Sequence, residues 1–170
     1  VSEGDVSEGD VSEGDSMSIE PVIYVVDDDT DSRESACALV GQMALKVQAF
    51  ASAEQFLATY NGHRPACLLT DHRMLGMTGV ELLERLRGSG VTLSVIVMTA
   101  YAETELTVRA IKSGAVTLLE KPFSDTALWN AIHDALAEDR EQFVKQSRID
   151  RIQTHLQSLT AAETDVLNLV

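Results

Sequence analysis

Cysteine is scarce in this chain, and so is every feature that would tie it to a membrane or an oxidising compartment. Among 170 residues there are two cysteines, Cys37 and Cys67, too few for a disulfide framework. No apolar run is long enough to span a bilayer, and no signal-peptide pattern occurs. We therefore expect a reduced, cytoplasmic protein.

Positive charge is also in short supply. Thirteen Lys and Arg residues stand against 27 Asp and Glu residues, which gives a formal net charge of −14. A surface of this sign repels phosphate backbones, so the composition argues against nucleic-acid binding by this portion of the protein itself. The length suits one domain of about 120 residues with appendages.

The chain opens on three copies of Val-Ser-Glu-Gly-Asp, in residues 1–15. This repeat is too short and too polar to build a packed unit, so we expect residues 1–16 to be disordered. Two interpretations stay open. The segment is a tag or leader ahead of a native start at Met17, or it is an acidic interaction tail.

Between these appendages, apolar runs rich in β-branched residues alternate with amphipathic segments. The runs are predicted to be strands at Val22 to Val26, Leu45 to Phe50, Cys67 to Thr70, Leu93 to Thr99 and Val116 to Glu120. The amphipathic segments are predicted to be helices at Asp31 to Met43, Ser52 to Tyr60, Thr78 to Leu86 and Glu103 to Lys112. Capping-box spacing marks three helix starts, in the pairs Asp31 with Glu34, Ser52 with Gln55 and Thr78 with Glu81. Alternation of this kind predicts an α/β fold with a doubly wound, five-stranded parallel sheet.

Chemically reactive side chains follow the ends of these predicted strands. In an open parallel sheet the carboxyl ends of the strands form the ligand site. The pattern therefore brings together three carboxylates, a hydroxyl and an ammonium, from Asp27, Asp28, Asp71, Thr99 and Lys121. Oxygen-only ligands favour Mg²⁺ or Mn²⁺ over Zn²⁺, and a cation would hold phosphoryl oxygens beside a carboxylate that can attack phosphorus. The sequence thus predicts a cation and phosphoryl site.

These motifs and their spacing resemble the receiver domain of bacterial two-component response regulators, and in particular its FixJ-like subgroup. The resemblance covers residues 22 to about 137, and we assign residues 17–137 to this domain. It implies a flavodoxin-like fold with strand order 2-1-3-4-5. It also implies that Asp71 accepts a phosphoryl group from a histidine kinase. Mg²⁺ would be held by Asp27, Asp28, Asp71 and the backbone carbonyl of Arg73, while Thr99 and Lys121 contact the phosphoryl group.

The chain departs from the family pattern at two positions. Leu75 stands where the family usually has proline, which predicts a less rigid loop after Asp71. Leu118 stands at a switch position that is commonly aromatic, so it cannot offer an aromatic edge or hydroxyl to Thr99. Tyr101, in the neighbouring loop, is a candidate for supplying the aromatic group instead.

From Asp125 onward the chain contains neither Gly nor Pro. We expect a helix from Thr126 to Ser158 that leaves the domain as a linker over residues 138–158. Its apolar seam, suited to pairing with a second copy, is Ile149, Ile152, Leu156 and Leu159.

Residues 159–170 resemble the start of a LuxR-type helix-turn-helix domain, with a further capping pair at Thr160 and Glu163. This implies a transcription regulator that dimerises on phosphorylation and binds DNA only as a longer protein. We expect self-phosphorylation and slow self-dephosphorylation rather than conventional enzyme activity.

Two other classes of protein remain as alternatives. An aspartyl-phosphate hydrolase shares the nucleophile chemistry, but it would normally carry a second Asp two residues after the first, where this chain has Arg73. A flavodoxin-like cofactor binder would need a Ser/Thr/Gly-rich phosphate loop after the first strand, where this chain has Asp27 and Asp28.

Overall fold

The computed structural model describes residues 20–167, and their side chains as far as residue 155. Five parallel strands form one sheet in the order β2-β1-β3-β4-β5. The strands are β1 (Val22–Val26), β2 (Lys46–Phe50), β3 (Ala66–Asp71), β4 (Ser94–Thr99) and β5 (Thr117–Glu120). The predicted fold class and strand order are confirmed, with strand ends within one residue of the prediction.

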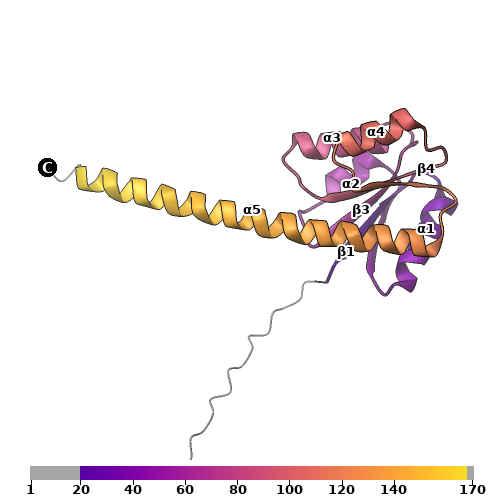
Figure 1. The fold of residues 1–170 in the computed structure, drawn as a ribbon, viewed down its shortest axis with the longest axis horizontal. Helices are drawn as coiled ribbons and strands as arrows, with labels where there is room; N and C mark the ends of the chain where they lie inside the picture. The colour runs from indigo at the N-terminus through magenta and orange to yellow at the C-terminus, as the bar shows by residue number, and fades with distance from the viewer. Residues whose placement is uncertain (1–19, 168–170) are drawn as a thin grey trace, which may run out of the picture.

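The helices cover both faces of the sheet (Figure 1). They are α1 (Thr30–Gln42), α2 (Ala53–Thr59), α3 (Gly79–Gly88), α4 (Thr104–Lys112) and α5 (Asp125–Leu167). Side chains of α2 and α3, with Ala110 of α4, contribute to the apolar cluster on one face, and side chains of α1 and α5 contribute to the cluster on the other. Alternation along the strands produces this division: Tyr24 points into the first cluster, whereas Ile23 and Val25 point into the second.

Two of the three predicted capping pairs are confirmed. The Thr78 hydroxyl and the Glu81 carboxylate form a complete capping box at α3, and Ser52 accepts a hydrogen bond from the Gln55 backbone N–H at α2. The pair at the first helix is wrong. Asp29 is the N-cap of α1, because its extended backbone lets its carboxylate accept from the Ser32 N–H, and Asp31 lies inside the first turn.

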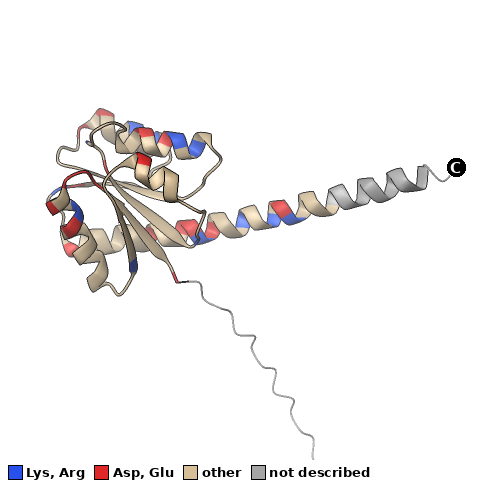
Figure 2. Cartoon of the chain, turned by 180° about the vertical axis from the view of Figure 1, so that it is seen from behind, with Lys and Arg blue, Asp and Glu red and all other residues tan. Residues whose placement is uncertain are grey.

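Helix α5 crosses one face of the sheet and then projects far from the body of the domain (Figure 1). Lys and Arg residues are interspersed with Asp and Glu residues along the projecting part (Figure 2). The helix continues without a break to Leu167, so the separate helix expected to begin after Thr160 is not seen. Residues 1–16 and the last residues of the 159–170 segment lie outside the described part. No helix in residues 20–167 combines the length and the apolar character that crossing a bilayer requires.

Candidate functional site

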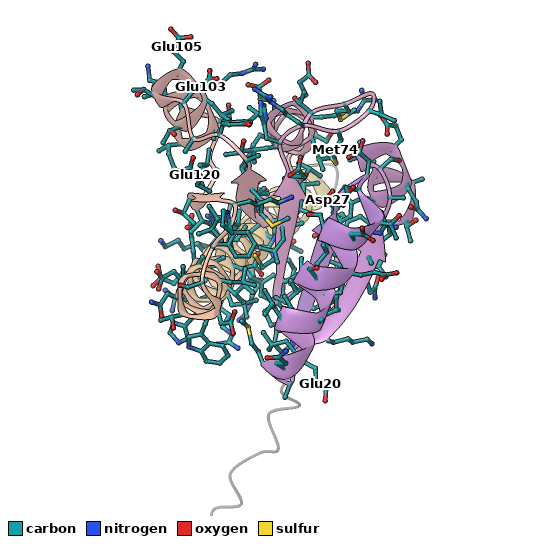
Figure 3. The ribbon with its side chains drawn as sticks, turned by 90° about the vertical axis from the view of Figure 1, so that its right-hand side faces the viewer. Glu20, Asp27, Met74, Glu103, Glu105 and Glu120 are labelled. Atoms are coloured by element: carbon teal, nitrogen blue, oxygen red, sulfur yellow. The ribbon has the colours of Figure 1, made fainter. Side chains whose placement is uncertain are left out.

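The predicted site residues gather at the carboxyl edge of the sheet. Asp71 and Thr99 are the last residues of β3 and β4, while Asp27 and Lys121 directly follow β1 and β5. Figure 3 shows Asp27 at the opposite end of the domain from Glu20, on the same side as Met74 and Glu120. Because all five strands are parallel, this edge collects every strand end, as expected for an open α/β sheet.

The Lys121 ammonium is the centre of the site. Its Nζ donates to Asp71 Oδ1 at 2.6 Å, to Asp27 Oδ2 at 2.8 Å and to Ser32 Oγ at 2.7 Å. The Ser32 hydroxyl in turn donates to Asp27 Oδ2 at 2.7 Å. One cation therefore joins carboxylates that the sequence separates by many residues.

The charge state of Lys121 follows from these partners. Burial of the ammonium lowers its pKa, but hydrogen bonds and charges from Asp27 and Asp71 outweigh that effect and raise the pKa above its ordinary value. Lys121 is therefore a permanent cation at neutral pH. It offsets the repulsion between two carboxylates that are nearly inaccessible to solvent.

Backbone N–H groups hold both carboxylates in fixed orientations. Asp27 Oδ1 accepts from the Asp29 N–H at 3.0 Å, and Asp71 Oδ2 accepts from the Arg73 N–H at 2.7 Å. The Arg33 guanidinium donates to the backbone carbonyl of Asp27 at 2.7 Å, which fixes the end of β1. These hydrogen bonds give each carboxylate a defined position.

Sequence reasoning missed Ser32 and Arg33. Both lie in the first turns of α1, and the correct N-cap would have revealed them. With Asp29 as the cap, Ser32 is the residue whose N–H folds back onto the loop, so the first turn of α1 faces Asp27. With Asp31 as the predicted cap, the helix would begin two residues later, and Ser32 and Arg33 would not be expected to face Asp27.

Asp28 lies apart from the Lys121 cluster. Its Oδ2 accepts a hydrogen bond from the backbone N–H of Leu75 at 2.8 Å, which ties the end of β1 to the loop after β3. Leu75 itself is 84% exposed. The loop after the predicted acceptor is therefore attached to Asp28 through a backbone group that proline lacks.

The oxygen donors fit a hard cation in kind, since they are carboxylates and a backbone carbonyl. Among the side chains described, those of residues 20–155, no group of three or more His, Cys, Asp or Glu is arranged as a metal site. Lys121 is what bridges Asp27 and Asp71 here. Magnesium coordination by Asp27, Asp28, Asp71 and Arg73 stays a prediction.

Thr99 is buried and its hydroxyl is engaged locally. Thr99 Oγ1 donates to the Tyr101 carbonyl at 3.1 Å and accepts from the Tyr101 N–H at 3.3 Å. The Tyr101 ring is 63% exposed, and the Arg73 guanidinium carbon lies 5.5 Å from its centre. The loops after β3 and β4 therefore meet over the site through Arg73 and Tyr101.

Leu118 lies in β5 and packs, partly buried, against the apolar cluster shared with α3 and Ala110 of α4. It contributes packing to this face but no polar group. The switch roles predicted for Thr99, Leu118 and Tyr101 are untested by this geometry. What the structure adds is a direct hydrogen-bonded contact between the Thr99 hydroxyl and the backbone of Tyr101.

The comparisons with known proteins concern the family and the fold. Residues 23–133 match the family model of the response regulator receiver domain. The chain is 36% identical to the transcriptional regulatory protein FixJ of Azorhizobium caulinodans, over 85% of this chain and 69% of that protein. It is 34% identical to the response regulator protein TodT of Pseudomonas putida, over 88% of this chain and 66% of that protein. The chain thus spans about two thirds of the length of these curated relatives.

Solved structures show the same similarity. A low-resolution structure of the response regulator StyR superposes with a TM-score of 0.77 at 35% identity, covering 88% of this chain and 76% of that one. The crystal structure of FixJ-N superposes with a TM-score of 0.66 at 36% identity, covering 69% of this chain and 94% of that one. The fold, the match over most of the chain and the similarity to FixJ and TodT together show that this chain belongs to the response regulator receiver domain family.

Proposed function

We propose that this chain is the receiver part of a phosphorylation-dependent response regulator and that Asp71 is the phosphoryl acceptor. The observation that carries the proposal is the contact of Lys121 with Asp71 and Asp27 at the carboxyl edge of the sheet. An ammonium beside a carboxylate can pair with the phosphoryl oxygens formed there. The cognate histidine kinase is the expected donor of the phosphoryl group.

The proposed transfer is a nucleophilic displacement at phosphorus. A carboxylate oxygen of Asp71 forms a bond to phosphorus as the bond to the imidazole nitrogen of a phosphohistidine breaks, and the electron pair leaves with that nitrogen. Lys121 already contacts Asp71, so its ammonium would lie within reach of the phosphoryl oxygens once the group is on Asp71. Thr99 would exchange its hydrogen bond to the Tyr101 carbonyl for one to a phosphoryl oxygen.

The proposed cofactor is Mg²⁺, held by Asp27, Asp28, Asp71 and the Arg73 carbonyl. When bound, it would offset the charge of the incoming phosphoryl group. Backbone hydrogen bonds orient two of these carboxylates: the Arg73 N–H donates to one oxygen of Asp71, and the Asp29 N–H donates to one oxygen of Asp27.

We do not assign conventional enzyme activity to this site. A hydrolase of the same nucleophile chemistry needs an acid/base group beside the acceptor, and Arg73 occupies the expected position. The Arg73 guanidinium is directed to the Tyr101 ring and cannot serve as a base at neutral pH. Slow self-dephosphorylation fits this arrangement better than rapid turnover.

The output of the proposed regulator is transcriptional control through a DNA-binding domain in the longer protein. Support comes from the relatives, whose names describe transcriptional regulatory proteins and response regulators. We further propose a cytoplasmic location and a homodimer in the phosphorylated state. Such regulators generally bind paired half-sites as two-fold dimers.

The direct test is covalent modification. Incubation with acetyl phosphate and Mg²⁺ should add one phosphoryl group to the parent chain, detected by intact-protein mass spectrometry, and none to Asp71→Asn. Asp31→Asn, an exposed carboxylate in the nearby first turn of α1, is the matched control and should be modified like the parent. Equal adduct in Asp71→Asn and in the parent would rule out Asp71. Asp28→Ala should lose Mg²⁺ binding while keeping the fold.

A further inference from the structure

A second buried ion pair lies at the opposite edge of the sheet from Asp71. Asp139 of α5 is fully buried, and its Oδ2 accepts from Arg64 Nε at 2.8 Å. The Arg64 guanidinium also donates to the backbone carbonyl of Asp139 at 3.2 Å and to the Thr92 hydroxyl at 3.1 Å. Arg64 therefore grips both the side chain and the backbone of this one turn of α5.

The same carboxylate also reaches the first residues of the two central strands. Asp139 Oδ2 accepts from the Ala66 N–H at 3.0 Å, and Oδ1 accepts from the Ser94 N–H at 3.4 Å. These are the starting residues of β3 and β4, which end at Asp71 and Thr99. A single side chain of α5 thus joins the beginnings of the two strands whose ends carry predicted site residues.

Asp139 lies at the point where α5 leaves the body of the domain. Asp139 is the last buried residue of the helix among the side chains described through residue 155. Beyond it the helix projects from the body, with apolar side chains such as Phe143 and Ile152 at least half exposed (Figure 1). The segment predicted as a linker therefore begins with a turn that is built into the domain.

Because Asp139 is buried, its carboxylate needs hydrogen-bond donors and an opposite charge. A carboxylate removed from water is stable only when its lone pairs and its charge are matched, and here Arg64 and two backbone N–H groups do so. Rotation or translation of α5 would break several of these bonds together. The contact therefore resists changes in the helix axis as well as unfolding.

We propose that Asp139 is a positioning residue that sets the direction in which α5 leaves the domain, by joining the helix to Arg64 and to the first residues of β3 and β4. The proposal depends on the geometry at this edge alone and not on phosphorylation. The ion pair of Arg64 with Asp139, remote from Asp71, would therefore orient the extension of α5 that leads to the rest of a longer protein.

The test measures orientation separately from stability. Spin labels at Ala58→Cys on α2 and Gln153→Cys on the extension, in a Cys37→Ser background with the buried Cys67 retained, report the distance between body and helix. Asp139→Asn keeps the size of the side chain but removes its charge. Glu141→Gln is the matched control, because Glu141 is exposed and pairs only loosely with Lys145 at 3.8 Å.

In pulsed electron–electron double resonance, the parent and Glu141→Gln should show the same narrow distribution of distances between the two spin labels. Asp139→Asn should show a broadened or displaced one. In Asp139→Asn one of the two carboxylate oxygens becomes an amide NH₂, so amide exchange should accelerate by about tenfold at whichever of Ala66 and Ser94 faces that nitrogen, the factor expected for a lost buried hydrogen bond. A folded Asp139→Asn chain with the parent distribution would overturn the proposal, whatever its loss of stability.

Arg64→Lys is the second variant if Asp139→Asn does not fold. Lysine keeps the positive charge but cannot contact the Asp139 carboxylate, its carbonyl and Thr92 at the same time, because it lacks the planar fork of arginine. The distance distribution should again broaden. An unchanged distribution in folded Arg64→Lys would show that the fork does not set the direction of the helix.

Discussion

Leu75 illustrates how one backbone atom can alter a candidate cation site. Its N–H donates to Asp28 Oδ2, whereas the proline that is usual at this position in the family has no N–H to donate. Its side chain is almost fully exposed, so the contribution of this residue to the site comes from its backbone. If Asp28 is a ligand of Mg²⁺, as we propose, this N–H would compete with the cation for the Asp28 oxygen.

Removing this N–H should favour Mg²⁺. Leu75→Pro should lower the dissociation constant for Mg²⁺ by about threefold to tenfold, the range that a net contribution of about 0.5–1.5 kcal/mol per hydrogen bond represents. Leu75→Ala retains the N–H and should bind Mg²⁺ like the parent. Isothermal titration of the three chains measures the difference. Equal affinities for Leu75→Pro and Leu75→Ala would show that the N–H does not compete.

Thr99 is the residue at which activation should be read. Its hydroxyl now contacts the Tyr101 backbone, and a phosphoryl group at Asp71 would offer a charged acceptor in its place. Because Leu118 carries no aromatic or polar group, we expect the change to pass from the Thr99 hydroxyl to the Tyr101 backbone, and from there along the chain to α4. The phosphoryl contacts supply the differential interaction that a population shift requires.

Thr99→Ala should therefore lose most of the response to beryllofluoride. The measurement is the chemical shift of backbone amides in α4, which should move in the parent and stay nearly fixed in Thr99→Ala. Thr107→Ala is the control, since the Thr107 hydroxyl donates only to the Glu103 carbonyl within its own helix start. A full response in Thr99→Ala would assign the signal to another residue.

Helix α1 depends on its N-cap both for stability and for the site. Asp29 accepts from the Ser32 N–H, and this turn places the Ser32 hydroxyl on Asp27 and Lys121. The cap therefore fixes a partner of the site as well as the end of a helix. Asp31, two residues later, has no comparable bond from its carboxylate among the described contacts.

The two aspartates should differ in their effect on stability. Asp29→Ala should reduce the free energy of unfolding by about 1 kcal/mol, the usual value of an N-cap side chain. Asp31→Ala should change it by less than about 0.5 kcal/mol, as is normal for an exposed position. Urea denaturation followed by circular dichroism measures both. Equal losses would contradict the assignment of Asp29 as the cap.

At the scale of the whole molecule, two apolar surfaces of the described residues are candidates for contact with a second copy. One is the α4 face, where Val108 and Ile111 are 45% and 48% exposed. The other is the α5 extension, where Ile149 and Ile152 are 47% and 60% exposed. Only the α4 face adjoins the loop from Thr99, so it is our candidate for the phosphorylation-dependent contact. The seam on α5 is short for an independent coiled coil.

Charged substitutions should separate these surfaces. Sedimentation velocity with beryllofluoride should show a dimer for the parent, a monomer for Val108→Asp with Ile111→Asp, and a weakened dimer for Ile149→Asp with Ile152→Asp. Substitution is preferable to ending the chain at Ala137, because that would remove Asp139 and its contacts with β3 and β4. A monomer only in the α5 variant would move the main contact to the extension.

The linear pattern alone determined the sheet and the membership of the site. Runs of Val, Ile and Leu between amphipathic segments predict the strands, the helices and a parallel sheet, since these depend on local periodicity and short connections. Parallel strands then bring their carboxyl ends to one edge, so Asp27, Asp71, Thr99 and Lys121 could be grouped without coordinates.

The tertiary structure decided the partners of these side chains. The three bonds of Lys121, the attachment of Asp28 to Leu75 and the role of Asp29 as the cap depend on backbone angles and packing that periodicity does not specify. The same is true of Asp139, which reads as a polar residue of a charged linker. Only the fold, by bringing Arg64 and the starts of β3 and β4 to one turn of α5, makes it a buried ion pair.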